Sequence, residues 1–109
     1  MTAIRSLPRR AGLRRGPDPH RVLARAFSAH GDLVDDGWTR PWASCTFDGA
    51  RHGFTLRCAR AAADRLAGMI EDIDIPIPGH ILASAAILRR HDSREATTLE
   101  IEALTVTGA

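Results

Sequence analysis

The side chains that could carry out chemistry are two cysteines and five histidines. The cysteines are Cys45 and Cys58, and the histidines are His20, His30, His52, His80 and His91. Metal sites are usually marked by spacings such as CxxC, HxH or HExxH, and the chain has none of them. It also lacks a glycine-rich phosphate-binding loop. We therefore expect no metal and no cofactor, and we favour a non-enzymatic protein over an enzyme.

Two of the histidines stand in segments that we expect to be turns. His52 follows Asp48 in the first predicted turn, and His80 follows Pro78-Gly79 before a predicted strand. Loops positioned by a rigid scaffold often carry function. One hypothesis is therefore a small-molecule enzyme or ligand-binding protein with a pocket near His52 and His80. The competing interpretation is that these side chains only fasten the turns.

The positive charge is concentrated at the N-terminus. Residues 1–25 contain seven arginines and one acid, a net charge of +6, whereas residues 26–109 have a net charge of −4. Arginines such as Arg9, Arg10, Arg14 and Arg15 could neutralise phosphates without reading a sequence. A nucleic-acid-associated protein that binds through this arm is a second functional hypothesis.

The composition indicates where the protein works. The chain has no lysine, asparagine, glutamine or tyrosine, which favours a GC-rich bacterial genome, and it has no apolar run of membrane-spanning length. We expect a cytoplasmic protein. The alternative is a mitochondrial protein, because the N-terminus is rich in arginine and residues 25–28 (RAFS) resemble a processing site.

The hydrophobic pattern predicts one domain preceded by an arm. Residues 1–17 contain prolines and glycines among arginines and predict a disordered arm. From Asp18 onward the pattern predicts a single α+β domain over residues 18–109. It begins with an amphipathic helix over 19–30, for which Asp18 is the N-cap and Pro19 the first residue.

The remaining elements are two predicted hairpins on either side of a helix. The first hairpin pairs Phe47 with Phe54, Cys45 with Leu56 and Ala43 with Cys58; a helix over 59–74 and strands over 80–90 and 97–106 follow. This ββαββ order predicts a two-layer fold with a four-stranded, mainly antiparallel sheet, an arrangement like the β-grasp topology.

Alternation places a second apolar surface on the far side of this sheet. If Ala43, Cys45 and Phe47 face the central helix, Trp42 points the other way. The second surface then holds Trp42, Leu82, Ala86, Leu88, Leu104 and Val106, bordered by Arg57, Glu100 and Glu102. We expect Trp38, by contrast, to pack at the sheet edge.

Such a surface needs a cover, and three covers are open. The N-terminal helix could dock there through Val22, Leu23 and Phe27, a second copy could pack sheet on sheet, or a protein partner or ligand could bind. We therefore expect a small association protein. Its candidate interface is Trp42, Arg57, Leu82, Leu88 and Leu104, and a homodimer is one expected form.

Overall fold

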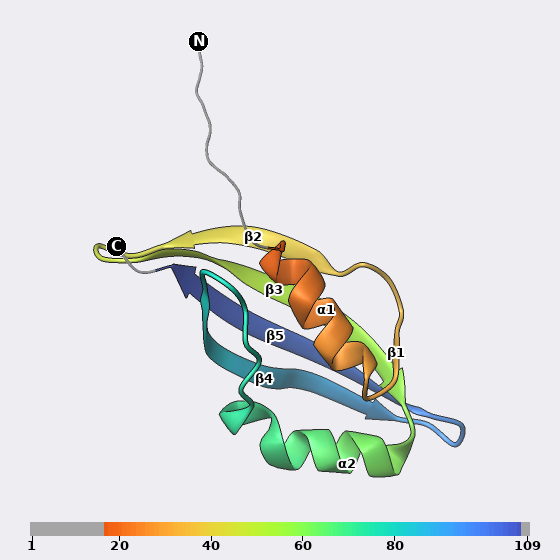
Figure 1. The fold of residues 1–109 in the computed structure, drawn as a ribbon. Helices are drawn as coiled ribbons and strands as arrows, with labels where there is room; N and C mark the ends of the chain where they lie inside the picture. The colour runs from red at the N-terminus through yellow and green to blue at the C-terminus, as the bar shows by residue number, and fades with distance from the viewer. Residues whose placement is uncertain (1–16, 108–109) are drawn as a thin grey trace.

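An antiparallel sheet with both helices on one face is the framework of the protein (Figure 1). It is seen in a computed structural model that describes residues 17–107. The elements are α1 (Pro19–Ser28), β1 (Asp32–Leu33), β2 (Trp38–Ala43), β3 (Asp48–Cys58), α2 (Arg60–Met69), a 3₁₀ turn (Ile70–Asp72), β4 (Ile81–Asp92) and β5 (Thr97–Thr107). The α+β class expected from the sequence is confirmed.

The sheet has five strands, with β3 and β5 at its centre. β4 lies beyond β5, and both β1 and β2 pair with the outer edge of β3. Because every pair is antiparallel, β3 and β4 run in the same direction, joined by α2 and separated by β5. This is a split β-α-β unit. The exact ββαββ order is not confirmed, because the short β1 adds a strand before the first hairpin.

Both hairpins close with the same serine-based turn. Ser44 Oγ accepts from the backbone N–H groups of Thr46 and Phe47, and Ser93 Oγ accepts from those of Glu95 and Ala96. A serine hydroxyl that bonds to backbone groups two and three residues on stabilises a tight turn. The first turn therefore spans Ser44 to Phe47.

This turn corrects the predicted register of the first hairpin. Ala43 pairs with Asp48 and Trp42 with Gly49, so the expected pairs of Phe47 with Phe54, Cys45 with Leu56 and Ala43 with Cys58 do not form. Cys45 and Phe47 are exposed in the turn and do not belong to the core. Cys58 is buried, as expected.

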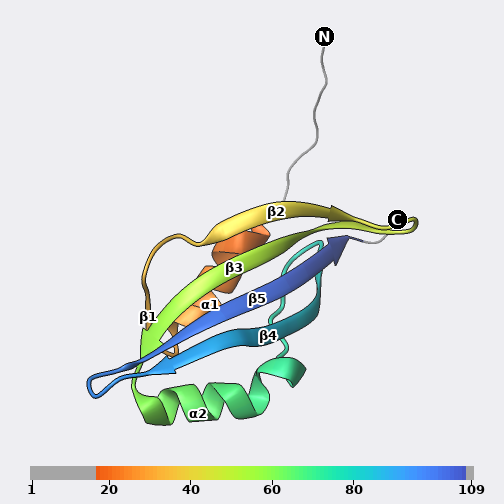
Figure 2. The same cartoon turned by 180° about the vertical axis from the view of Figure 1, so that it is seen from behind.

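The first helix forms where the sequence predicts it but docks on the other face of the sheet. Asp18 Oδ1 accepts from the N–H of His20 at 3.0 Å, and Pro19 occupies the first helical position. Leu23 and Phe27 are fully buried, and the Phe27 ring lies 5.5 Å from that of Phe54. α1 therefore shares a face and one hydrophobic core with α2. Seen from behind, α1 lies beyond the strands and α2 runs alongside β4 (Figure 2).

The second helix and its 3₁₀ extension complete the core. They lie within the predicted helix over 59–74, and their inner face buries Ala63, Leu66 and Ile70. The sheet contributes alternate residues of its central strands, such as Leu56 and Leu99. No helix within residues 17–107 is both long and apolar enough to cross a membrane. Residues 1–16, nearly all of the predicted arm, lie outside the described part of the chain.

Candidate functional site

The central strand β5 defines the two faces of the sheet. Thr97, Leu99, Ile101, Ala103 and Thr105 are buried against the helices, and the residues between them point the other way. Directly paired residues of neighbouring strands share a face. We call the side without helices the open face. It contains Trp38, Arg40 and Trp42 of β2, Gly49, Arg51, Gly53, Thr55 and Arg57 of β3, Ile81, Ser84, Ala86, Arg89 and His91 of β4, and Thr98, Glu100, Glu102, Leu104 and Val106 of β5. Leu88, the unpaired residue at a register shift of β4, also belongs to it, because it lines a cleft with Trp38 and Glu100.

β2 supplies the aromatic part of the open face. Trp38, Arg40 and Trp42 alternate along the strand, so all three point to the same side. The guanidinium carbon of Arg40 lies 4.9 Å from the centre of the Trp38 ring, a cation–π contact. Trp42 is half-buried, whereas Trp38 is 40% exposed. The sequence prediction for Trp42 is correct, but Trp38 lies on the face and does not only pack at the edge.

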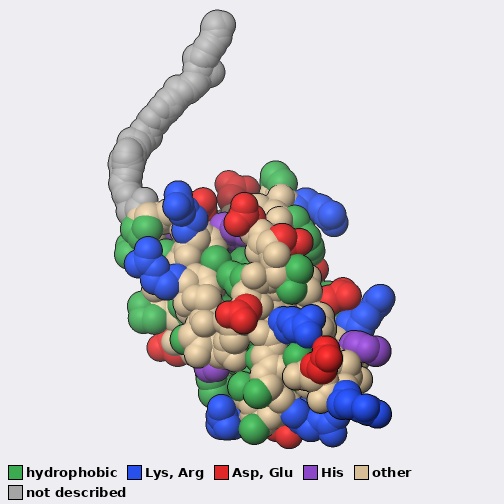
Figure 3. All heavy atoms as spheres, turned by 90° about the vertical axis from the view of Figure 1, so that its right-hand side faces the viewer, with side chains coloured by type: hydrophobic (Ala, Val, Ile, Leu, Met, Phe, Trp, Pro, Cys, Tyr) green, Lys and Arg blue, Asp and Glu red, His purple; other side chains and the backbone are tan. Residues whose placement is uncertain are grey.

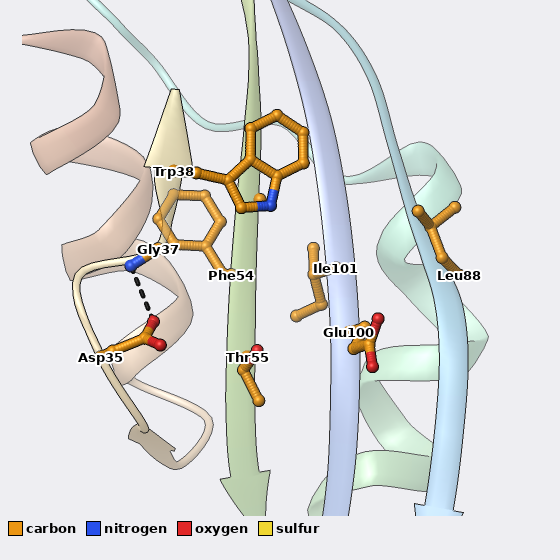
Figure 4. A pocket seen from close by; sticks show the side chains of 9 residues that line it. Asp35, Gly37, Trp38, Phe54, Thr55, Leu88, Glu100 and Ile101 are labelled. Atoms are coloured by element: carbon orange, nitrogen blue, oxygen red, sulfur yellow. Dashed lines mark hydrogen bonds between the residues drawn. The ribbon is translucent and has the colours of Figure 1, made fainter. Parts of the chain in front are cut away.

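Trp38 lines one side of a cleft of about 160 Å³ (Figure 4). Its indole lies across β3, and Leu88 of β4 and Glu100 of β5 stand on the other side of the cleft. The turn that precedes β2 also lines the cleft, and in it the N–H of Gly37 donates to Asp35 Oδ1 at 2.8 Å. Gly37 has φ of +73°, a left-handed conformation that glycine adopts without strain.

β4 supplies exposed apolar side chains. Ile81 and Leu88 are 63% and 62% exposed. Two register shifts, next to Leu82 and Ile87, change which residues of β4 face the helices. As a result Leu82 pairs with Thr105 and packs against the core, so its predicted place on the second surface is wrong. Leu104 lies on the open face, as predicted, and Leu88 lines its cleft.

Charged residues on the open face carry both signs. Arg51 forms an ion pair with Glu102 at 3.2 Å, and Arg57 lies 3.9 Å from Glu95. Glu100 and Arg89 face each other on neighbouring strands, but within residues 17–107 they form no ion pair. On the side of the molecule seen in Figure 3, acidic and basic side chains are likewise interspersed.

The two histidines of the predicted pocket line one cavity on the helix side of the sheet. The cavity has a volume of about 320 Å³ and lies between the start of α1, the loop before β4, the first residues of β3 and the last residues of β5. Its lining includes Asp18, Thr39, Asp48, His52, His80, Thr105 and Thr107. His80 Nδ1 donates to the carbonyl of Pro78 at 3.1 Å. His52, however, does not flank a turn: it lies within β3 and is 1% exposed.

His52 belongs to a chain of hydrogen bonds that joins α1 to the sheet. Its Nδ1 lies 3.0 Å from Nδ1 of His20, and its Nε2 lies 2.9 Å from the hydroxyl oxygen of Thr105. His20 Nε2 donates to the carbonyl of Asp36 at 2.6 Å. Burial lowers the pKa of His52 to about 4, the neighbouring His20 acts in the same direction, and Asp18 opposes them.

Several sequence-based expectations lie outside these two sites. Within residues 17–107, no group of three histidine, cysteine or acidic side chains is arranged to hold a metal ion. Cys45 and Cys58 are both unbridged, one exposed and one buried. Arg9, Arg10, Arg14 and Arg15 lie outside the described residues, so binding of nucleic acid through the arm stays a prediction.

Comparison with other proteins adds no functional assignment. No protein-family model matches the sequence, no curated protein resembles it significantly, and no solved structure matches the fold.

Proposed function

We propose that the protein works by association and that its open face packs against the open face of a second copy. The observation that carries this proposal is the placement of both helices on one side of the sheet. Within residues 17–107 nothing covers the other side, although it holds both tryptophans of the chain and two aliphatic side chains more than half exposed. An uncovered sheet face that exposes large apolar side chains is a candidate interface.

The edges of the sheet are less suited to association than its face. A strand adds to an edge through a regular row of backbone hydrogen bonds. β2 carries Pro41, which has no N–H to donate, and β4 has two register irregularities that interrupt such a row. Two copies would therefore meet face to face more easily than edge to edge.

The charges of the open face support a second copy as the occupant. On the open face β3 carries two arginines, Arg51 and Arg57, separated by Gly53 and Thr55, and the adjacent β5 carries Glu100 and Glu102; we call these two sets the basic and the acidic column. A two-fold axis parallel to the strands and between these columns would place the basic column of each copy opposite the acidic column of the other. Opposite charges in this arrangement fix the register and orientation of an interface.

The size of the face is adequate for a stable dimer. Four strands about 4.8 Å apart and about ten residues long, at about 3.3 Å per residue, present roughly 600 Å² of flat area. Side-chain relief increases the accessible area above this figure. A standard stable interface buries about 800 Å² on each subunit, so a sheet-on-sheet contact is of the required order.

The experiment compares two apolar-to-acid substitutions at residues of similar exposure. Leu88, 62% exposed, lines the cleft of the open face, and Val34, 59% exposed, lies in the loop before β2. Burying an unpaired carboxylate in an interface is strongly unfavourable. We expect Leu88→Asp to convert the dimer to a monomer and Val34→Asp to leave it intact, as measured by light scattering during size exclusion.

A monomeric full-length chain at all concentrations up to about 1 mM, a concentration that would populate even a weak complex, would overturn the proposal. Equal effects of the two substitutions would also overturn it, because the contact would then not involve the open face. Circular dichroism of both variants establishes that each retains the fold.

A second candidate function is binding of a small polar ligand in the histidine cavity. It is favoured by the convergence of His52, His80, Asp18 and Thr107 on one volume of about 320 Å³. Nuclear magnetic resonance with a library of small polar fragments tests it. We expect shifts confined to the amides around His80 and Thr107, and we expect His80→Ala to abolish them. If no fragment shifts these amides, the cavity is not a binding site.

A further inference from the structure

The contact between His20 and His52 has a property that ordinary hydrogen bonds lack: it joins two identical atoms that are both titratable. The two Nδ1 atoms are 3.0 Å apart, so one of them must carry a proton and the other must accept it. We infer that this pair holds α1 on the sheet as long as its two imidazoles carry at most three ring N–H protons, which leaves one of the rings neutral. A fourth proton, which makes both rings positively charged, releases α1.

The neutral pair satisfies all of its hydrogen-bonding groups. His20 Nε2 faces the carbonyl of Asp36, which can only accept, so this nitrogen carries the proton. His20 Nδ1 is then the acceptor, and His52 Nδ1 donates to it. The remaining nitrogen, His52 Nε2, accepts from the hydroxyl of Thr105. Two imidazoles, a carbonyl and a hydroxyl thus form one continuous chain without charge.

One added proton can also be accommodated. With both nitrogens of His20 protonated, Nδ1 of His20 donates to His52, and the proton of His52 moves to its Nε2. Thr105 then accepts from His52 Nε2 and turns its own hydrogen toward the carbonyl of Ala50, which lies 3.4 Å away. The hydrogen bond between the two rings and the one between His52 and Thr105 both reverse direction, but each donor keeps an acceptor.

A second added proton has no such solution. Both Nδ1 atoms then carry hydrogen, and two positively charged rings face each other at 3.0 Å. Charged and titratable groups near the pair come from α1 (Asp18, Arg21), the segment before β2 (Asp35, Asp36), β3 (Asp48) and the loop before β4 (His80). Within residues 17–107 none of their side chains bonds to either Nδ1 atom. Repulsion is relieved when α1 moves away from β3.

The test measures hydrogen exchange of backbone amides in the full chain between pH 7 and pH 5. Protection factors correct for the intrinsic pH dependence of exchange. If opening of α1 exposes His52, whose pKa then rises from about 4 to its ordinary 6.5, the opening equilibrium should increase about 20-fold over this range. We expect α1 amides such as those of Leu23 and Phe27 to lose that much protection relative to amides of β5.

Two variants and one control separate the histidine pair from general acid effects. Glutamine at residue 52 cannot titrate. His52→Gln should therefore reduce the 20-fold change in the opening equilibrium of α1 to less than about threefold. His20→Gln should also reduce the change, but less than His52→Gln does, because burial of the His52 ring, the largest cause of its low pKa, remains. His91→Gln alters an exposed histidine of the open face and should keep the full 20-fold change.

Three outcomes would overturn the inference. α1 and β5 could lose protection equally, which would indicate global unfolding without release of α1. Protection of α1 could be independent of pH. His52→Gln and His20→Gln could both retain the full change, which would place the responsible proton elsewhere.

Discussion

The indole of Trp38 lies directly over Gly53, its partner on the neighbouring strand. A β-carbon added at Gly53 would come within 2.0 Å of the Cε2 and Nε1 atoms of the ring. The flat position of the indole on the open face therefore depends on the absence of a side chain at residue 53. Gly53 is part of the candidate interface although it contributes no side chain to it.

We predict that Gly53→Ala destabilises the fold by about 1–3 kcal/mol, because the ring must move or the strands must separate to admit the methyl group. The displaced indole should also weaken self-association. Urea denaturation followed by circular dichroism measures the first effect, and light scattering measures the second.

A matched control lies in α2. A β-carbon at Gly68 would meet no atom within 4 Å, and the residue is helical. Gly68→Ala should therefore stabilise the protein by about 0.5–1 kcal/mol and leave association unchanged. If Gly53→Ala were as harmless as Gly68→Ala, the close contact between Trp38 and Gly53 would not exist in solution.

The second prediction concerns the dependence of stability on pH. The pKa of His52 is about 4 in the folded protein and 6.5 in an ordinary environment, so the unfolded chain takes up the proton first as the pH falls. Stability from this residue is fully present above pH 6.5 and is lost between pH 6.5 and pH 4. The loss amounts to about 3 kcal/mol, measured as the free energy of unfolding in urea.

Asp92 also contributes to acid sensitivity, but at lower pH. Its carboxylate accepts from the hydroxyl of Thr97 at 2.7 Å and from Arg90 at 3.0 Å, and both bonds lower its pKa. Stability from Asp92 is present above the ordinary pKa of 3.8 and is lost as the pH falls below it. A flat free energy of unfolding from pH 6.5 to pH 4 would contradict the assignment to His52.

The third prediction separates the two cysteines. Cys45 is exposed in the first hairpin turn, whereas Cys58 is 7% exposed and burial raises the pKa of its thiol. Only a thiolate reacts rapidly with iodoacetamide. We expect one alkylated residue, Cys45, in the native protein and two in urea, as determined by peptide mass spectrometry. Equal rates of modification at both residues in the native state would contradict this arrangement.

The sequence predicts the faces of the sheet better than it predicts the strand register. The observed pairing of the first hairpin differs from the predicted one by ten positions along β3, an even number. An even shift moves a strand without exchanging its faces, so Trp42 stays on the side without helices. Hydrophobic alternation carries this information, and the turn does not alter it.

The rest of the candidate site depends on features that alternation does not encode. The position of the first hairpin turn is set by the local hydrogen bonds of the Ser44 side chain, which can form a tight turn without glycine. The register shifts of β4 moved Leu82 to the core and placed Ile81 on the open face. His20 was missed because its importance lies in a contact 32 residues away. The spacing of Trp38, Arg40 and Trp42 could have placed Trp38 on the open face.

Because both tryptophans lie on one face of the sheet, the intrinsic fluorescence of the protein should respond mainly to events on that face. The chain has no tyrosine, so its intrinsic fluorescence arises almost entirely from Trp38 and Trp42, which both lie on the open face. Events on the helix side, including any movement of α1, should leave the emission nearly unchanged. Formation of a sheet-on-sheet dimer should shift it to shorter wavelength, because the indoles then lose contact with water. A titration followed by emission therefore reports on one surface of the molecule without any added label.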